Sequence, residues 1–419
     1  MRPNETTIVA IVGAGIVGLC TAYALRQAGY RVVVYDPNPP GSQCSSGNAG
    51  AISSGSIAPL AMPGVLKNAV SMLLDSTSPL YVPAHYWLKA APWFFRFIRA
   101  ARPERVAHIA SALNGLLSGS VQSHAQLARA IGRPELIQLT GQLHLYPNES
   151  SYRKDLASWN LKTSHGVKAD KIDRAAILEL EPAIGPNYTT GVFLPDEGWI
   201  SEPQAYAQAI AQALVNMDVR FETARIRSMA RMDEGWTLSD GAGRWSADRV
   251  VICAGAWSRP LLAAQGFDVP LESQRGYHQR IPDANPGMRR VVVLADRKVF
   301  MTPTGDGGLR MAGTVEFGGN DAPPSEQRAK LLVHHARACF PSLPADGYSS
   351  WMGLRPCMPD SMPIIGPVPD RPGLWCAFGH GHLGLTGSVN TGHLIARAMA
   401  GQATTQELSP FAVRRFSLA

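Results

Sequence analysis

Hydrophobic and polar positions in the first thirty-six residues predict a strand, a helix and a second strand. Residues 7–12 are small or β-branched, which is typical of a buried parallel strand. In residues 16–28 the apolar positions recur at helical spacing on one face, and Gly29 ends the pattern. Residues 30–36, YRVVVYD, again favour a strand. The pattern therefore predicts one βαβ unit at the start of the chain.

Three glycines lie between the first strand and the helix in G-x-G-x-x-G spacing, at Gly13, Gly15 and Gly18. The first allows a tight turn, the second lets the backbone approach a pyrophosphate, and the third lets helix and strand pack closely. The N-terminus of the helix offers free N–H groups to phosphates. Asp36 ends the second strand, where a carboxylate can accept hydrogen bonds from ribose hydroxyls. The unit predicts dinucleotide binding but leaves NAD and FAD open.

The segment after Asp36 does not continue with regular βα units. Residues 37–64 are rich in Gly, Ser, Ala and Pro and poor in charge. Such a loop suits close backbone contact with a bulky flat ligand, although a long surface linker is the alternative. This composition favours FAD over NAD.

Periodicity further along the chain predicts two groups of elements. A helix and a strand follow one another in residues 201–229, and RVVICAGA (249–256) is a strand with its turn. A glycine-rich turn, GHGHLGLTGS (379–388), leads into an apolar helix at 389–400. Further strands are predicted at 142–147, 190–195, 276–281, 289–296, 298–303 and 309–317.

Four segments, in this order, resemble one family from end to end of the chain. They are CSSGNAGAISSGSIAPLAMPG (44–64), VVICAGAWS (250–258), GLRPCMPDSMPIIGPV (353–368) and GHGHLGLTGSVNTGHLIARAMAG (379–401). The resemblance is to bacterial FAD-dependent D-amino-acid dehydrogenases of the small-subunit type. These belong to the wider family of D-amino-acid oxidase, glycine oxidase and sarcosine oxidase.

The resemblance implies an α/β, two-domain fold. A Rossmann-like FAD-binding domain is expected from residues 1–60, 198–265 and 346–419. Residues 61–197 and 266–345 are expected to form a substrate domain with a mainly antiparallel sheet over the flavin.

The resemblance also implies which residues contact FAD. They are Gly13, Gly15, Ile16, Val17, Gly18, Asp36, Ser45, Asn48, Ala49, Gly50, Ile52, Arg225, Ala254, Gly255, Gly353, Gly381, His382, Leu383, Gly384, Leu385 and Thr386. Sarcosine oxidases hold flavin through a cysteine near a Pro-Asp dipeptide. Matching on that dipeptide places Gly353 at the linking position and leaves Cys357 out of register. We therefore expect non-covalent FAD. The positive end of the helix after the glycine-rich turn would favour the anionic reduced flavin.

For substrate, the resemblance implies that Arg355 binds a carboxylate and that Tyr277 helps to hold the molecule. His382 is expected near the flavin ring. A planar guanidinium suits a carboxylate because it makes a two-point contact. The implied reaction is hydride transfer from Cα of a D-amino acid, or of a cyclic imino acid such as a D-proline derivative, to flavin N5. The imine then hydrolyses to a keto acid and ammonia.

The electron acceptor is implied to be a respiratory or other acceptor besides O₂, such as a quinone or a partner protein. Three alternatives remain open at this stage. One is an amine, glycine or sarcosine-type oxidase that uses O₂, and another is a flavin-binding subunit without substrate activity of its own. The third is an NAD-dependent dehydrogenase, in which the flavin loop and the glycine-rich turn would have no role.

Composition and charge indicate which classes of partner the chain can bind. The net charge is +7, but the basic residues are scattered and the aromatics form no stacking platform among them, which argues against nucleic acid. Residues 78–106 combine aromatic and basic side chains, which either lie on an anionic membrane or pack on the substrate domain. No apolar run reaches eighteen residues and no signal peptide is recognised, so we expect a cytoplasmic protein, free or peripheral on the inner face of the plasma membrane.

Cysteine and histidine spacing argues against metal and disulfides. The six cysteines include no C-x-x-C pair, so neither a zinc ribbon nor a disulfide framework is predicted. The turn at His380 and His382, with His393 beyond it, could be read as a metal site. It lacks carboxylate partners, and we expect no metal.

Overall fold

A computed structural model describes residues 6–63 and 80–416. The last residue of the predicted flavin loop, Gly64, and the first two residues of the 78–106 stretch lie outside the described residues.

The first sheet has six strands and carries the predicted βαβ unit. All of its neighbouring pairs are parallel except the last, which is antiparallel. The strand order is β10 (Arg220–Glu222), β2 (Arg31–Tyr35), β1 (Ile8–Val12), β14 (Arg249–Ile252), β21 (Leu374–Phe378) and β20 (Ile364–Pro367). Strands from the start, middle and end of the chain thus form one layer, as expected of a discontinuous Rossmann-like domain.

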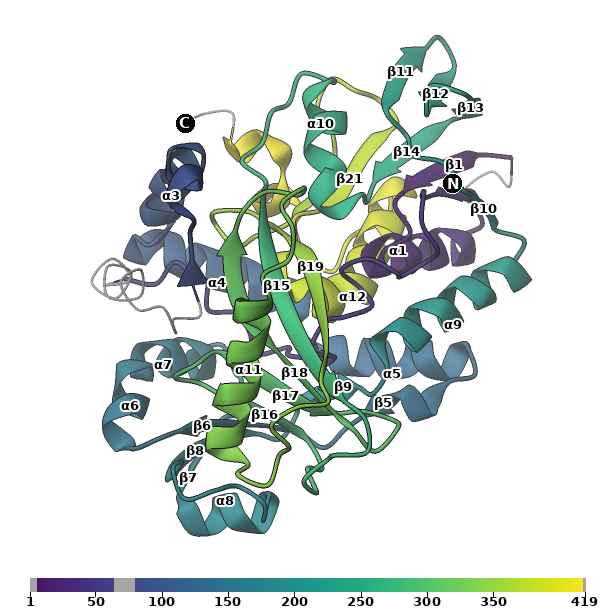
Figure 1. Ribbon diagram of the computed structural model, residues 1–419. Helices are drawn as coiled ribbons and strands as arrows, with labels where there is room; N and C mark the ends of the chain where they lie inside the picture. Colours follow the sequence, from purple (N-terminus) through teal and green to yellow (C-terminus); the bar gives the residue numbers. More distant parts are fainter. Residues whose placement is uncertain (1–5, 64–79, 417–419) are drawn as a thin grey trace.

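Helices from distant segments cover this sheet. In Figure 1 the purple β1 and α1 lie beside the yellow α12, so the two ends of the chain share one core. The helices that contribute to this core are α1 (Ile16–Gln27), α4 (Pro103–Leu117), α5 (Ser120–Ala130), α9 (Pro203–Asn216) and α12 (Gly384–Met399). On the other side of the sheet lies the short α10 (Ser258–Ala263).

The second sheet is mainly antiparallel, as predicted. Among the strands that the structure describes, the pairs β16–β6 and β18–β4 are parallel and the others are antiparallel. The strand order is β19 (Ser349–Cys357), β15 (Glu272–Ile281), β18 (Leu309–Phe317), β17 (Val299–Pro303), β16 (Val291–Leu294), β6 (Gln142–Tyr146), β8 (Thr190–Leu194) and β7 (Asp170–Ile172), with β4 (Leu80–Tyr81) beside β18. The two-domain α/β fold expected from the sequence is confirmed.

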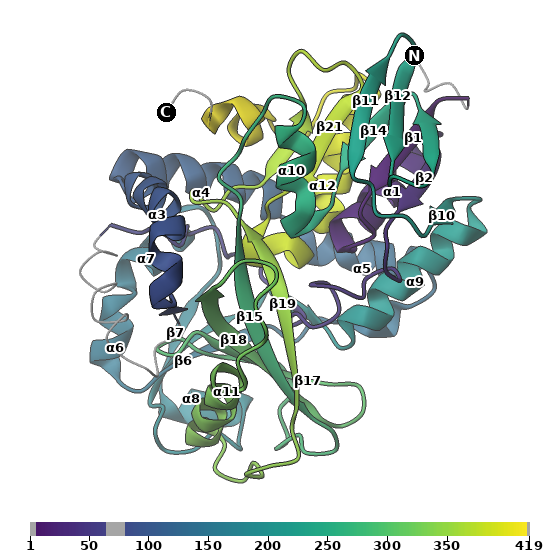
Figure 2. The ribbon, with the colours of Figure 1, turned by 45° about the horizontal axis from the view of Figure 1, so that its top comes forward.

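Helices also pack on the second sheet. One of its faces is covered by α11 (Glu326–Cys339), as Figures 1 and 2 show. The aromatic helix α3 (Trp87–Ala100) packs against Phe317 at the end of β18. Within residues 6–63 and 80–416, the other α-helices are α6 (Glu149–Lys154), α7 (Leu156–Ser164) and α8 (Arg174–Leu180).

Two three-stranded sheets complete the structure. One joins the two parts of the molecule and consists of β3 (Ala51–Ile52), β9 (Gly198–Ile200) and β5 (Ile137–Gln138). The other is a meander of β11 (Ser228–Met232), β12 (Gly235–Ser239) and β13 (Arg244–Ala247).

Two features differ from the expected domain boundaries. β19 lies in the third predicted FAD segment, yet it pairs with β15 in the second sheet. The helices α4 and α5 lie in the predicted substrate domain, yet their apolar faces are buried in the core around α12. Their amphipathic patterns predict a buried face but do not say which sheet covers it.

No helix among residues 6–63 and 80–416 is long and apolar enough to cross a membrane.

Candidate active site

A cavity of about 1430 Å³ is lined by residues from both large sheets. The glycine turn and Asp36 border one part of it, and strands β15, β16, β17 and β19 border another. Its size and its two-sided wall are typical of a site for a large organic ligand.

The glycine turn has the geometry that the spacing predicts. Gly13 has φ +115°, and a Cβ there would lie 2.4 Å from the carbonyl oxygen of Cys253. A Cβ on Gly18 would lie 2.0 Å from the carbonyl oxygen of Gly13, so helix and turn touch without a side chain. Both positions therefore require glycine.

Asp36 lies at the end of β2 with its carboxylate fixed by backbone groups. Ala14 N–H donates to Oδ2 and Asn38 N–H donates to Oδ1, each at 2.8 Å. The carboxylate borders the cavity beside the glycine turn, where a ribose can reach it.

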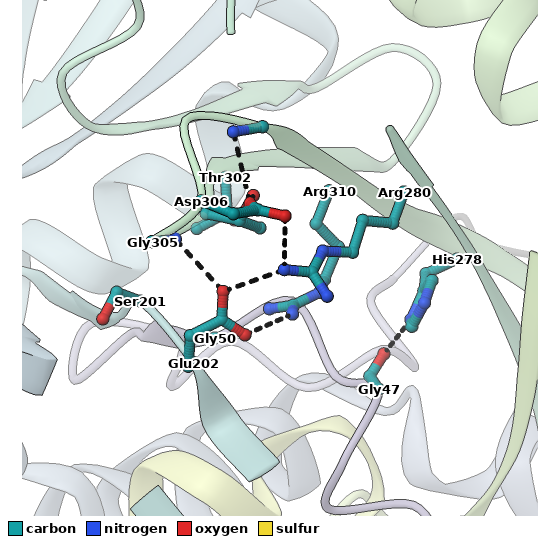
Figure 3. A network of polar contacts seen from close by, with 12 residues as sticks. Gly47, Gly50, Ser201, Glu202, His278, Arg280, Thr302, Gly305, Asp306 and Arg310 are labelled. Atoms are coloured by element: carbon teal, nitrogen blue, oxygen red, sulfur yellow. Dashed lines mark hydrogen bonds and ion pairs between the residues drawn. The ribbon is translucent and has the colours of Figure 1, made fainter. Parts of the chain in front are cut away.

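The second sheet holds the first half of the flavin loop. His278 donates from Nδ1 to the carbonyl oxygen of Gly47 at 2.7 Å, and Thr302 donates to that of Ala49 at 2.7 Å. Burial lowers the pKa of His278 to about 4, so the ring is neutral and its Nδ1 carries the hydrogen of this contact. Figure 3 shows the contact beside an ion-pair network in which Glu202 binds both Arg280 and Arg310.

The second half of the loop is held by a buried carboxylate. Glu197 accepts hydrogen bonds from Ser54 N–H (2.6 Å), Ser54 Oγ (2.9 Å) and Gly55 N–H (2.6 Å). Burial raises the pKa of Glu197, and these bonds partly offset that effect. Sequence reasoning missed this residue, because an isolated glutamate before a strand carries no motif.

The glycine-rich turn lies where the loop meets α12. A 3₁₀ turn at Gly381–Leu383 precedes the helix, and Ser53 N–H donates to Thr386 Oγ1 at 3.1 Å. His382 borders the cavity, and desolvation, followed by the charges of Arg355 and Lys162, lowers its pKa to about 4. The His382 side chain is therefore neutral at neutral pH.

Arg355 extends from β19 over the backbone of Gly276 on β15. Its Nη1 donates to the carbonyl oxygen of Thr314 at 2.8 Å, and its guanidinium borders the cavity. Within the described part of the chain it forms no ion pair with a carboxylate. A fixed, half-buried guanidinium without an anion can bind a carboxylate of a ligand.

Thr314 is a second residue that sequence reasoning missed. Its φ is +56°, which is rare for a β-branched residue, and it lies in a bulge where Thr314 and Val315 both oppose Gly276. Its Oγ1 is buried without a hydrogen-bond partner among the described residues, and the residue borders the cavity beside Arg355. Strained residues of this kind concentrate at functional sites.

The substrate-holding role expected of Tyr277 is not supported by the contacts of its hydroxyl. The hydroxyl donates to Glu316 and accepts from Ser325 N–H at the start of α11. The ring is buried in the core beneath that helix, although the residue also borders the cavity. These contacts give Tyr277 a structural role, so its binding to substrate stays a prediction.

The predicted cofactor residues converge on the cavity. All of them border it except Gly18, which packs the helix on the turn, and Ile52, which is buried in β3. The fit to FAD is therefore good: an acid for the ribose, a glycine turn for the pyrophosphate, and a loop facing a sheet for the ring. Sequence reasoning did not identify Trp351, Thr314 and Lys162 as residues of this wall.

The chemistry of the cysteines agrees with a non-covalent cofactor. A Cβ on Gly353 would lie 2.1 Å from the indole of Trp351, so a linking side chain has no room there. All six cysteines are free, and burial raises the pKa of each thiol, including Cys44 and Cys253 at the cavity wall. Among the described residues no group of three or more His, Cys, Asp or Glu could hold a metal ion.

Comparison with known proteins supports the assignment of this cavity to FAD. Residues 9–398 match the family model DAO, described as FAD dependent oxidoreductase. A D-amino-acid oxidase of Bradyrhizobium diazoefficiens is 36% identical over 416 residues, covering 97% of this chain and 98% of the relative. A D-amino acid dehydrogenase of Sinorhizobium medicae is 28% identical, covering 97% and 99%. Among solved structures, glycine oxidase from Geobacillus kaustophilus superposes with a TM-score of 0.79 at 23% identity, covering 98% and 99%. The chain therefore belongs to the DAO family of FAD-dependent oxidoreductases, and FAD is its cofactor.

Proposed function

We propose that this protein oxidatively deaminates a D-amino acid, or a cyclic imino acid such as a D-proline derivative, with FAD as the oxidant. The observation that carries the proposal is Arg355, a fixed guanidinium without a protein anion at the wall of the cofactor cavity. A carboxylate bound there would share the cavity with the ring of FAD. The relatives named D-amino-acid oxidase and D-amino acid dehydrogenase support the amino-acid class and the D configuration.

The residues of the chain bind and orient the substrate, and bound FAD would accept the hydride. Arg355 holds the α-carboxylate and so fixes the direction of the Cα–H bond. His382 is neutral because its pKa is about 4, so it adds no positive charge beside the substrate amine. The apolar side chains of Val293 and Phe300 border the same cavity and exclude water from it.

The acceptor proposed for the electrons is a quinone or a partner protein. O₂ is the second candidate, favoured by the relative that is 36% identical and is named an oxidase. Formation of one peroxide per substrate consumed in aerated solution would identify O₂ as the acceptor. Turnover that needs an added quinone would select the dehydrogenase.

Substitution of Arg355 tests the proposal. Arg355→Lys keeps the charge but loses the planar two-point contact. The rate of anaerobic flavin reduction at sub-saturating D-amino acid should fall about thirty-fold or more, with unchanged FAD content. Wild-type rates in the variant would remove Arg355 from the substrate site and contradict the proposal.

A peripheral contact with the membrane is proposed for α3. Trp93 and Phe97 pack inward, whereas Leu88 and Phe95 are exposed beside the exposed cation Arg99. An exposed apolar and basic face suits an anionic lipid surface. Wild-type protein should sediment with anionic vesicles, and a Leu88→Glu, Phe95→Glu variant should not. Equal sedimentation of both would overturn the contact.

A further inference from the structure

One part of the cavity wall carries positive charge apart from Arg355. Three lysines border it: Lys154 at the end of α6, Lys162 on α7, and Lys298 just before β17. Asp155 is the single acid that borders the cavity in this part of the described chain. Apolar residues close to Lys298 in the β16–β17 pairing, Ala295 and Phe300, also border the cavity.

Lys162 is held in place by an aromatic side chain. Its Nζ lies 4.3 Å from the centroid of the Trp159 ring, a distance at which a cation is attracted to the ring face. Trp159 is buried, and its indole N–H donates to Tyr146 Oη at 2.9 Å. The ammonium therefore has a defined position at the wall.

The two nearest carboxylates are already engaged by other groups. Asp155 accepts from Lys298 at 3.3 Å and from the Tyr146 hydroxyl at 3.1 Å. Both oxygens of Glu197 accept from the flavin loop. Lys162 forms no ion pair with any described carboxylate.

The environment of Lys162 leaves it charged but poorly solvated. Desolvation and the nearby Lys298 lower its pKa to about 8, with Glu197 and Asp155 opposing. At pH 7 it is therefore still mostly protonated. A desolvated cation without a direct ion pair is unfavourable, and a bound carboxylate in contact with it would relieve that cost.

Lys162 and Arg355 border the same cavity, which His382 also borders. Arg355 binds the carbonyl oxygen of Thr314, and the preceding residue, Gly313, lies against the backbone of Lys298, one of the three lysines of this wall. A ligand in this cavity could therefore bind Arg355 through its α-carboxylate and Lys162 through a second anionic group.

We propose that Lys162 forms a subsite for a second carboxylate, so that the preferred substrates are amino acids with an acidic side chain. This inference rests on the proposed function, in which Arg355 holds the α-carboxylate. The neutral walls beside Lys162 accommodate the methylene groups between the two acids.

Binding of inert ligands tests the subsite without turnover. Glutarate has two carboxylates, and its monoamide has the same shape with one. Binding to the holoenzyme is followed by the change in the flavin absorption spectrum and by thermal shift. Glutarate should bind about 10- to 150-fold more tightly than the monoamide, the range expected for one charge-assisted contact.

Two variants separate a local contact from long-range attraction. Lys162→Met removes the charge with little change in shape and should bring the glutarate to monoamide ratio close to one. Lys168→Met is the matched control, because Lys168 is exposed, pairs with Asp196 and does not border the cavity. It should retain the wild-type ratio. Loss of the ratio in both variants would show long-range attraction and overturn the subsite.

The inference and the proposed function fail in different ways. Equal binding of glutarate and its monoamide to the wild type, which needs no variant to fold, would overturn the subsite. The proposed function would stand in that case if D-alanine reduces the flavin. A flavin that no amino acid reduces would contradict the proposed function, while a preference for glutarate that Lys162→Met abolishes would still support the subsite.

Discussion

Gly276→Ala should move the guanidinium of Arg355 without removing its charge. An added Cβ would lie 2.2 Å from Cζ and 2.4–2.5 Å from both Nη atoms of Arg355. Ordinary contact begins near 3.4 Å, so the guanidinium must withdraw by about 1 Å or more. The atoms that must shift are the far end of a long side chain, so the effect on folding should be small. The 2.8 Å bond to Thr314 should be lost or lengthened.

A displacement of this size should reduce catalysis strongly. Misplacing a bound group by 1 Å can cost on the order of a hundredfold in rate. Stopped-flow reduction of the flavin by a D-amino acid should therefore be slowed about a hundredfold. FAD content and thermal unfolding should stay near wild type, because the three atoms nearest to the added Cβ all belong to the guanidinium of Arg355.

Gly305→Ala is the control for this variant. A Cβ there has no neighbour closer than 3.6 Å, so it should change neither stability nor reduction. Wild-type reduction kinetics in Gly276→Ala, with Gly305→Ala also normal, would refute the placement of substrate on Arg355.

Three further predictions concern the cofactor and stability. Glu197→Gln places an amide NH₂, which is a donor, toward the N–H groups of the flavin loop. Titration of the apoprotein with FAD should then show binding that is weaker by roughly 1.5 to 3 kcal/mol. Unchanged affinity would show that Glu197 does not support the cofactor site. Acid precipitation should release all the yellow colour to the supernatant, since colour in the pellet would mean a covalent link. Burial lowers the pKa of several histidines below the usual 6.5, so the unfolded chain takes up more protons and the free energy of unfolding should fall as pH drops from about 6.5 toward 4. Among them are His124 (pKa about 4), His278 (about 4) and His380 (about 3). Urea unfolding at pH 7 and pH 5 should show a contribution of about 2 kcal/mol per histidine, and a drop that is no smaller in His380→Gln would contradict the assignment for that residue.

The sequence was sufficient for the parts of the fold with strong local signals. The glycine turn, the buried strand before it and Asp36 follow one another in a short segment. The backbone lies close to itself at the turn and to the Asp36 carboxylate, and this segment borders the cavity. The alternating strands of the second sheet were also found, because one of their faces is covered by α11. Such patterns depend on burial of each element and can be read one segment at a time.

Features that depend on distant contacts could not be read in this way. Thr314 has a left-handed backbone conformation that no local residue signals, and Tyr277 turns its hydroxyl toward Glu316 because of the strand register. Lys162 reaches the cavity from a helix about 190 residues before Arg355 in the chain. Their placement follows from how the segments assemble, which single-sequence periodicity does not contain.

The proposed oxidation of D-amino acids by FAD can be followed in the absorption spectrum of the purified holoenzyme, mixed without oxygen with D- and L-amino acids and with N-methylglycine. The oxidised flavin bands should disappear with one or more D-amino acids, with formation of ammonia and a keto acid, or of a cyclic imine from a cyclic substrate. Flavin that stays oxidised with every D-amino acid, or that is reduced only by L-enantiomers or N-methylglycine, would contradict it.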